Sequence, residues 1–397
     1  MTNDEHVVYY HRRPDLLWKH GKPLLTSIDI ELTERCNNDC IHCCINLPED
    51  DPAERRELST REWQGVLDQA AELGALTVRF TGGEPLLRPD FTELYLYARR
   101  LGLRVLLFTN ARLITPELAD LFTRVAPREK IQITVYGMKA ESYAAVSRRA
   151  TGFAECRAGI DLLLERKIPF LVKGTVFPDT IDEMEAFIRW ASTIPGMDSM
   201  PSFPMFLDMR HRRDCAAENK RIRALRLSPE EGLRILTTQP ALYRQEMERF
   251  CDAFLGSLND AVFNCNHGNA VCVDAYGKMQ FCLGLRDPET TLDIREHDLK
   301  EMLTTFIPAL RRRVSNRPEF LKRCGRCFLR GLCEQCPAKS WSEHGVLDQP
   351  VDYVCEVAHI QARYLGLLKP GEKSWEVEDW QERLAEMRKT VVSKKRI

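Results

Sequence analysis

The sequence predicts an α/β fold, in which a partial, TIM-like (β/α)6 barrel is followed by a small cysteine-rich domain. Three observations support this prediction. Short apolar runs alternate with amphipathic stretches from Thr26 to about Phe206, helix-start signals fall between those runs, and eight cysteines gather in the last third of the chain. Successive strand and helix units of this kind form a parallel sheet. Six of them make about three quarters of an eight-stranded barrel, and we expect its open side to admit a large substrate.

The expected strands are nearly continuous apolar runs, which suit parallel strands covered on both faces. They cover Ile28 to Leu32, Leu76 to Phe80, Val105 to Phe108, Ile131 to Val135, Phe170 to Val176 and, more weakly, Met200 to Phe206. Two further strand-like pieces lie among the later cysteines, at Val271 to Val273 and Met279 to Leu283.

Three helix starts have recognisable capping signals, which combine a capping side chain with proline or glutamate in the first turn. They are Ser59 with Glu62, Thr115 before Pro116, and Ser228 before Pro229 with Glu231. Together these patterns divide the chain into five segments. They are an N-terminal extension (1–25), the barrel (26–207), a charged helical bridge (208–260), the cysteine-rich domain (261–364), and a final segment (365–397) with a polar helix, Trp375 to Lys389, and a basic tail.

The composition, 44% hydrophobic and 29% charged in 397 residues, is that of an ordinary folded protein. No apolar run reaches about 18 residues and no secretory signal is present, so we expect a cytoplasmic protein without a membrane span. A net charge of -1 gives no global attraction for nucleic acid or an anionic membrane. Basic patches such as Arg311 to Arg313 are interpreted as solvated surface, and the patch from Arg210 to Arg226 is alternatively a docking site for an acidic partner.

Fifteen cysteines in a chain without a secretory signal favour metal or redox chemistry over disulfides. Three of them follow the first expected strand with the spacing Cys36-x3-Cys40-x2-Cys43. The eight later ones are Cys265, Cys272, Cys282, Cys324, Cys327, Cys333, Cys336 and Cys355. An iron-sulfur cluster held by protein alone takes four thiolates, so eight can close two clusters, whereas three leave one iron open. A zinc site remains the alternative for each set, and a plain electron-transfer cluster is a further alternative for the first.

The first set resembles the signature of the radical S-adenosylmethionine (radical SAM) enzymes. The resemblance extends to Thr81-Gly82-Gly83-Glu84-Pro85 and Thr109-Asn110, at the ends of the second and third strands. In that family three thiolates hold a 4Fe-4S cluster whose open iron binds the methionine part of SAM, and electron transfer releases a 5′-deoxyadenosyl radical. The resemblance implies the same role for Cys36, Cys40 and Cys43. One departure is His42, where the family often has an aromatic residue before the third cysteine.

The resemblance also implies contacts to SAM. The expected contact residues are Gly82, Gly83, Glu84 and Pro85, with Glu84 on the ammonium group, then Asn110 and Thr134 on the adenosine side with Tyr136 and Gly137, and more weakly Lys173 and Thr175 near the ribose. Glycines there would let the backbone approach the bound methionine closely. The other cysteines, Cys44, Cys156, Cys215 and Cys251, are expected to be bystanders.

The cysteine-rich domain resembles the SPASM extension of radical SAM enzymes that modify peptides and proteins. By position, the resemblance implies one auxiliary 4Fe-4S cluster on Cys265, Cys272, Cys282 and Cys336. It implies a second on Cys324, Cys327, Cys333 and Cys355. Cys333 and Cys336 are separated by two residues where three are common. The cofactors expected are therefore SAM and three 4Fe-4S clusters.

These features predict a radical SAM enzyme that abstracts hydrogen from a peptide, in particular a ribosomally made precursor, and then completes an oxidative crosslink or a similar maturation. Two closed clusters suit an oxidation because they can accept the electron that the product must lose. Only 35 residues precede Cys36, so we expect a separate leader-recognition protein or use of an exposed strand edge, besides a flavodoxin- or ferredoxin-type electron donor.

Two alternatives stay open on the sequence alone. One is a SPASM-type enzyme that acts on a small molecule, such as a sugar, a porphyrin or a cofactor precursor. The other is a non-enzymatic iron-sulfur electron carrier. No catalytic acid or base is assigned, because Asp274, His267 and Tyr136 are as readily loop or wall residues. Leu283 after Cys282 and Val273 after Cys272 stand where sulfatase-maturing relatives have an aspartate, which disfavours formylglycine formation.

Overall fold

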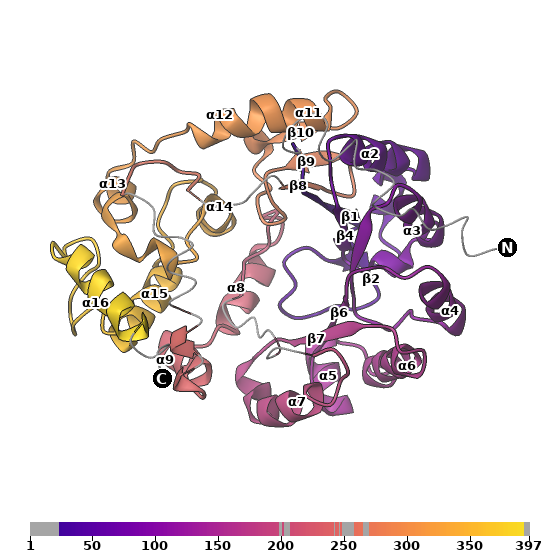
Figure 1. The fold of residues 1–397 in the computed structure, drawn as a ribbon, viewed down its shortest axis with the longest axis horizontal. Helices are drawn as coiled ribbons and strands as arrows, with labels where there is room; N and C mark the ends of the chain where they lie inside the picture. The colour runs from indigo at the N-terminus through magenta and orange to yellow at the C-terminus, as the bar shows by residue number, and fades with distance from the viewer. Residues whose placement is uncertain are drawn as a thin grey trace. The chain divides into compact units, whose positions relative to one another are not determined.

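The computed structural model describes residues 24–197, 201, 207–241, 243–245, 247, 258–264 and 270–392, the last five by their backbone alone. The chain forms two compact units (Figure 1). Unit 1 comprises Met1–Leu225 and His267–Pro308, and unit 2 comprises Arg226–Asn266 and Ala309–Ile397. This division differs from the segments expected from the sequence, because the strand that begins at Ala270 pairs with the first strand of the sheet and so joins unit 1.

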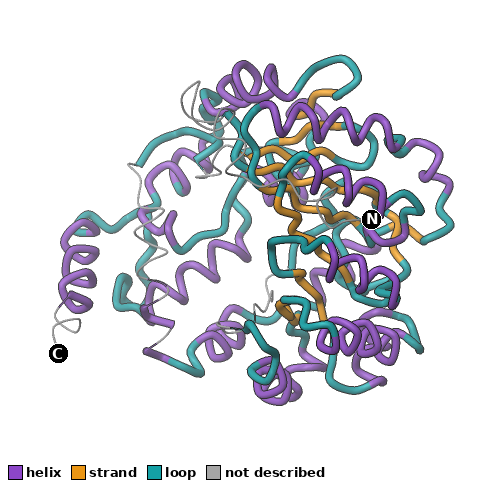
Figure 2. Tube along the Cα trace, turned by 45° about the vertical axis from the view of Figure 1, so that its right-hand side comes forward, coloured by secondary structure: helices purple, strands orange, loops and turns teal. Residues whose placement is uncertain are grey.

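Unit 1 is built on an eight-stranded, mostly parallel sheet, which confirms the predicted α/β class (Figure 2). In sheet order the strands are β10 (Thr291–Asp293), β9 (Lys278–Gln280), β8 (Ala270–Val273), β1 (Ser27–Thr33), β4 (Thr77–Gly82), β5 (Arg104–Thr109), β6 (Ile131–Val135) and β7 (Phe170–Gly174). The strands from β8 to β7 are parallel, whereas β9 and β10 are antiparallel additions. Short strands β2 (Arg35–Cys36) and β3 (Leu47–Pro48) pair separately. Of the weaker expected strand at Met200 to Phe206, only Pro201 lies within the described residues.

The helices of unit 1 follow the strands as the sequence predicts. They are α2 (Thr60–Glu72), α3 (Phe91–Arg100), α4 (Pro116–Arg124), α5 (Ala140–Ser147), α6 (Gly152–Glu165), α7 (Met184–Ala191), α8 (Ala216–Ala224) and α11 (Leu299–Glu301), with α12 (Ile307–Arg311) at the boundary of the units. The capping box of Ser59 and the cap of Thr115 both form. In the part of the chain that the structure describes, no helix is long and apolar enough to cross a membrane.

The two faces of the parallel sheet differ in polarity. One face packs beneath α2, α3, α4 and α6 (Figure 1), and its side chains are apolar and almost fully buried. They include Ile28, Ile30, Val78, Phe80, Val105, Leu107, Ile131, Ile133, Phe170 and Val172. The opposite face has polar and charged side chains in alternation with these, namely Asp29, Glu31, Arg79, Thr81, Gln132, Thr134 and Lys173. A parallel sheet covered by helices on both faces would be apolar on both, so the polar face is the one left for function.

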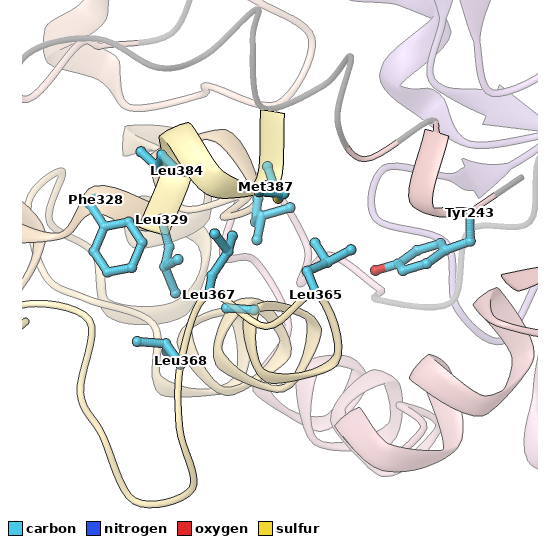
Figure 3. Close-up of a cluster of buried hydrophobic side chains, with 10 residues drawn as sticks. Tyr243, Phe328, Leu329, Leu365, Leu367, Leu368, Leu384 and Met387 are labelled. Atoms are coloured by element: carbon cyan, nitrogen blue, oxygen red, sulfur yellow. The ribbon is translucent and has the colours of Figure 1, made fainter. Parts of the chain in front are cut away.

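Unit 2 has its own hydrophobic core (Figure 3). Its helices are α9 (Pro229–Leu236), α13 (Pro318–Lys322), α14 (Pro337–His344), α15 (Asp352–Tyr364) and α16 (Trp380–Val392). The core gathers Tyr243, Phe328 and Leu329 with leucines that follow α15. Leu384 and Met387 also bury their side chains there, so the helix expected to be polar has one apolar side. It begins five residues after the expected start at Trp375, whose ring packs edge-on against His359 at 5.3 Å.

Candidate metal centres and cofactor site

The three cysteines of the first set lie on a loop at the C-terminal end of β1. Cys36 ends β2, and the loop that follows it is fixed at both sides by backbone hydrogen bonds. The N–H groups of Asp39 and Ile41 donate to the end of α5 at 3.0 Å each, and Leu47 donates to Glu34 at 2.8 Å. The carboxyl ends of parallel strands are where barrel enzymes place their active sites. The loop is therefore both rigid and correctly located for a catalytic site.

The three thiols of this loop lie close enough to influence one another. Burial raises the pKa of the Cys36 thiol, and Cys40 raises it further, while burial and Cys43 raise the pKa of Cys40. Backbone N–H groups approach two of the sulfurs at 3.4 Å, that of Asn38 at Cys36 and that of Asn46 at Cys43. Buried thiolates need a compensating positive charge, and hydrogen bonds to sulfur are typical of iron-sulfur sites. This donor set fits a cluster with three protein ligands.

Glu84 lies beside this loop in a fully buried position. Its carboxylate accepts hydrogen bonds from Thr109 Oγ1 at 2.8 Å, from the N–H of Asn110 at 2.8 Å and from the N–H of Leu86 at 3.1 Å. Burial nevertheless raises its pKa to about 7. Asn110 in turn donates through Nδ2 to Asn37 at 2.7 Å and approaches Cys36 Sγ at 3.8 Å. The structure thus brings the expected cluster ligand Cys36 together with two residues expected to contact SAM.

Packing within the protein requires the two glycines before Glu84, which are Gly82 and Gly83. A Cβ atom at Gly82 would collide with the carbonyl oxygen of Thr33, and one at Gly83 would collide with that of Arg35. Gly82 also has a φ of +123°, which disfavours any other residue. The sequence analysis attributed these glycines to a close approach of the cofactor. The structure adds an independent reason, since they let β4 lie against the strand end that leads into the cysteine loop.

The other expected SAM contacts lie on β6 and just after it. Thr134 is on the polar face of the sheet, in register with Lys173 on β7. Tyr136 hydrogen-bonds with the Cys40 thiol, and its ring meets that of His42 at 5.6 Å. Burial lowers the pKa of His42 to about 4. At neutral pH this histidine is therefore an uncharged ring in an aromatic setting, in place of the aromatic residue common in the family.

Two arginines to which the sequence assigned no role at the site hold the cysteine loop. Arg210 was expected in a solvated basic patch, but its side chain is buried. Arg112 donates to the carbonyl of Asn37 at 2.5 Å and to Asn38 Oδ1 at 2.7 Å. Arg210 is bound by Asp214 at 2.6 Å and reaches the carbonyl of Cys43 at 3.4 Å. Neither arginine belongs to a motif, because each acts on backbone that is distant in sequence. Arg112 follows Asn110 by two residues, which is the only signal that could have marked it.

A buried charge network links the cysteine loop to the β8–β9 hairpin. Arg286 pairs with Glu31 at 2.5 Å and with Glu34 at 2.7 Å, and all three side chains are at most 5% exposed. Tyr276 in the hairpin donates to Glu34 at 2.9 Å. The sequence did not decide whether Asp274 is a catalytic base or a loop residue. In the structure its carboxylate accepts hydrogen bonds from the N–H groups of Tyr276 and Lys278 at 3.0 and 2.8 Å. It therefore stabilises the hairpin turn.

Unit 2 has a cavity of about 360 Å³ lined by the later cysteines. Cys324, Cys327, Cys333 and Cys355, the set expected for the second auxiliary cluster, all line it. Burial raises the pKa of Cys333, and Cys327, Cys355 and Cys324 raise it further, so the four thiols form one group. Ser374 Oγ lies 3.0 Å from Cys327 Sγ, and the N–H of Gln335 donates to Cys333 Sγ at 3.4 Å. Four converging thiols with hydrogen-bond partners fit a closed iron-sulfur cluster.

Two arginines lie beside these thiols. Arg330 donates to the carbonyl of Cys324 at 2.9 Å, and Arg323 hydrogen-bonds with the Cys355 side chain. Positive groups at this position favour thiolates and a negatively charged cluster. The four-thiol cavity thus provides charge compensation of its own.

The other expected cluster set is described only in part. Cys272 lies on β8 and is fully buried, Cys282 follows β9, and Cys265 lies outside the described residues. Cys336 is the residue before α14 and lines the unit 2 cavity with the four thiols named above. Among the described residues, no three His, Cys, Asp or Glu side chains are arranged around a position for a single metal ion. His267, Cys251 and the basic tail from Lys394 also lie outside the described residues.

Comparison with known proteins supports this reading of the loop. Residues 30–191 match the profile of the Radical SAM superfamily. The chain is similar to the AdoMet-dependent heme synthase of Methanosarcina barkeri, with 26% identity over 355 residues that cover 86% of this chain and 96% of that protein. It is similar to the PqqA peptide cyclase of Ruegeria pomeroyi, with 32% identity over 162 residues, 41% of each chain.

The similarity in fold to solved structures extends well beyond residues 30–191. A structure described as native anSMEcpe with bound AdoMet and a peptide aligns with a TM-score of 0.60 and 15% identity, over 92% of this chain and 99% of that one. The alignment therefore includes much of the cysteine-rich region as well as the parallel sheet.

Proposed function

Because residues 30–191 match the Radical SAM superfamily, we propose that this protein is an oxidative peptide maturase that acts on a ribosomally made precursor. The observation that supports this proposal best is the presence of two different thiol sites in one chain. One site has three thiols beside Glu84 and Asn110. The other has five thiols around a cavity in unit 2, four of which belong to the set expected for one cluster. Three thiols suit a reactive cluster, and four suit an electron acceptor.

In this proposal the residues of unit 1 bind and orient the cofactor. Cys36, Cys40 and Cys43 hold a 4Fe-4S cluster, and the Glu84 carboxylate receives the ammonium group of SAM. When bound and reduced, this pair supplies a 5′-deoxyadenosyl radical that abstracts hydrogen from a substrate. Asn110 keeps Glu84 and the cysteine loop in one arrangement through its hydrogen bonds. Thr134, Gly82, Gly83 and Pro85 complete the proposed contact set.

The later cysteines hold two auxiliary 4Fe-4S clusters in this proposal. Cys324, Cys327, Cys333 and Cys355 bind one, and Cys265, Cys272, Cys282 and Cys336 bind the other. When present, such clusters supply an acceptor for the electron that the substrate loses in an oxidation. Anaerobic reconstitution should then give about twelve irons per chain. A value near four would exclude the auxiliary clusters, and zinc in the isolated protein would favour the zinc alternative.

A peptide substrate is supported by two of the similar proteins. One is named a PqqA peptide cyclase, and the solved anSMEcpe structure contains a bound peptide. Co-expression of the enzyme with short peptides encoded beside its gene, followed by mass spectrometry, tests the proposal. A loss of two or more hydrogens from one peptide, dependent on Cys36, supports a peptide maturase. No mass change in any of them, from an enzyme that cleaves SAM, would contradict it.

A tetrapyrrole is the second candidate substrate. The relative that aligns over nearly its whole length is named a heme synthase, whereas the peptide cyclase aligns over 41% of its length. Incubation of the reduced enzyme with a propionate-bearing iron tetrapyrrole distinguishes the two candidates. Conversion of that compound, without modification of any neighbouring peptide, would establish the second candidate in place of the first.

The partners follow from the proposed chemistry. A flavodoxin or ferredoxin would supply the electron for SAM cleavage, and a separate recognition protein would present the leader of the precursor. Cytoplasmic location is part of the same proposal, because free thiols and clusters persist in a reducing compartment. Tight binding of a precursor by the purified enzyme alone would remove the need for a recognition protein.

A further inference from the structure

The polar face of the unit 1 sheet contains a group of side chains that the proposed mechanism does not use. Phe108 on β5 is in register with Gln132 on β6, and Thr134 on β6 is in register with Lys173 on β7. Side chains that pair in a parallel ladder point to the same face. Phe108, Gln132 and Lys173 therefore form one continuous surface next to Thr134, a residue expected to contact SAM.

Two cations flank the ring of Phe108. The Lys173 ammonium lies 4.3 Å from the ring centroid, and the Arg79 guanidinium carbon lies 5.0 Å from it. Arg79 is neutralised by Asp29, whose carboxylate is 2.8 Å away. Among the described residues, no carboxylate pairs with Lys173. Burial and the nearby Arg79 both lower its pKa, as expected for a cation held without a counter-ion. Lys173 is therefore a positive charge that no carboxylate among the described residues pairs with.

Other polar atoms on this face also lack a partner within the described part of the protein. Gln132 Oε1 is buried with no hydrogen-bond donor, and Arg79 Nε is buried with no acceptor. An unsatisfied buried polar atom costs about 1–3 kcal/mol, and most such atoms in folded proteins are paired. Here a cation, an orphaned acceptor and an orphaned donor occur together beside an aromatic ring. Ligand sites place a few polar groups against hydrophobic and aromatic side chains, and this face has the same combination.

We propose that Lys173, Arg79 and Gln132 form a subsite for a carboxylate group of the substrate. Lys173 supplies the counter-charge, and the Arg79 and Gln132 side chains lie beside it on the same face. The ring of Phe108 provides an apolar wall below it. This inference rests on the proposed function and narrows its substrate to molecules with an accessible carboxylate. Both candidate classes can supply one, as a peptide carboxylate or as a tetrapyrrole propionate.

Binding measurements on the full-length, cluster-loaded protein test this subsite without any turnover. The tetrapyrrole probe is coproporphyrin III, compared with its tetramethyl ester, and the peptide probe is a pool of acetylated tripeptides with free carboxylates, compared with the same pool amidated. The wild-type protein should bind the carboxylate form of one probe about tenfold or more tightly, since a hydrogen bond to a charged group has about that effect. The probe that shows the preference identifies the source of the carboxylate.

Substitutions at Lys173 test whether this residue causes the preference for carboxylate probes. Lys173→Met keeps the aliphatic stem over Phe108 and should remove the preference, whereas Lys173→Arg should retain most of it. Lys167→Met, which removes a lysine outside this face, is the matched control and should bind as the wild type does. Equal binding of charged and neutral probes by the wild type, or an unchanged preference in Lys173→Met, would overturn the subsite. Weaker binding of SAM itself by Lys173→Met would overturn it too, by reassigning Lys173 to the cofactor.

A separate measurement keeps this test independent of the proposed function. Wild-type protein that fails to form 5′-deoxyadenosine after reduction contradicts the radical enzyme, whatever the probes do. Wild-type protein that cleaves SAM but shows no carboxylate preference contradicts only the subsite. Thermal melting of the two Lys173 variants shows whether either has lost its fold. If Lys173→Met does not fold, a carboxylate preference retained by Lys173→Arg supports the subsite, and its loss contradicts the subsite.

Discussion

The two thiol sites use the same side chain in different surroundings, and the surroundings determine what each can do. In unit 1, the loop with three thiols lies beside Asn110 and the buried carboxylate of Glu84, which are polar groups suited to a small polar ligand. In unit 2, the four thiols of the expected set line a cavity together with Cys336, and Arg323 and Arg330 lie beside these thiols. In the proposed assignment, a fourth thiol in unit 2 occupies the coordination position that stays open for a ligand in unit 1.

The sites also differ in how the chain builds them. The unit 1 thiols come from eight consecutive residues, Cys36 to Cys43, which are held by the end of α5 and by Asn110 after β5, both distant in sequence. The unit 2 thiols come from a short segment, Cys324 to Cys333, and from Cys355 on α15. A compact loop on a parallel sheet is suited to precise orientation of a reacting group. A site that ties a loop to a helix also stabilises its own unit, since metal binding contributes to folding.

The largest expected effect is loss of the radical chemistry when the three-thiol site is removed. Replacement of Cys36, Cys40 and Cys43 by alanine should reduce 5′-deoxyadenosine formation to background, because SAM would lose the iron that binds it. About eight irons should remain if the auxiliary clusters are intact. Cys44→Ala, which removes the adjacent thiol, is the control and should keep both activity and iron. Cleavage that survives in the triple variant would disprove the assignment.

The second prediction concerns the four-thiol site. Cys333→Ala should lower the iron content by up to about four atoms per chain and abolish formation of oxidised product. Cleavage of SAM should continue, because the unit 1 ligands are unchanged. Cys336→Ala is the informative comparison, since Cys336 lines the same cavity but is assigned to the other cluster. Identical electron paramagnetic resonance changes in the two variants would show that the expected division of ligands is wrong.

The third prediction concerns the network between the cysteine loop and the β8–β9 hairpin. Arg286→Met would leave Glu31 as a buried carboxylate without its counter-charge, whereas Glu34 would keep its ion pair with Arg212. Loss of one partner from a buried ion pair costs about 3–5 kcal/mol, which urea unfolding can measure. Arg295→Met is the matched control, because the Arg295–Glu62 pair is 44% and 37% exposed and such pairs contribute about 0–1 kcal/mol. Equal destabilisation by the two changes would show that the network is not important for stability.

Much of the fold was predictable, because apolar runs and capping residues are local signals. Strands β1, β4, β5, β6 and β7 lie within one or two residues of the expected runs. The pairing of β8 with β1 was not predictable, since it joins residues more than 240 positions apart in the chain. The start of α16 was predicted too early for a similar reason: Trp375 is held by His359, a tertiary contact.

The candidate site likewise contains residues that the sequence predicted and residues that it did not. Cys36, Glu84 and Asn110 were expected from motifs at strand ends, and the structure brings them together. Arg112 and Arg286 were missed, because a buried arginine is recognisable only from the carbonyl or carboxylate that it meets. The role of Asp274 was left open for the opposite reason. The hydrogen bonds by which Asp274 stabilises the turn are local, but its position near a cysteine favoured a catalytic role equally well.

The smallest expected effect is a pH dependence of SAM binding that only the three-thiol site should show. Burial raises the pKa of Glu84 to about 7, so below that pH the carboxyl of the free protein is largely protonated and cannot pair with an ammonium group. Affinity for SAM should therefore rise as the pH increases towards 7 and level off above it, by up to about tenfold per pH unit below the pKa. Isothermal titration at pH 6, 7 and 8 measures the trend.

The matched variants for this trend are two glutamate substitutions. Glu84→Gln should bind SAM more weakly and with little dependence on pH, because an amide has no charge to gain. Glu62→Gln changes a capping carboxylate on α2 whose pKa is lowered rather than raised, and it should keep the wild-type trend. A pH dependence that persists in Glu84→Gln would assign the titration to another group and would separate Glu84 from the ammonium of SAM. The four-thiol site would then be the better supported half of the comparison, since its assignment does not depend on Glu84.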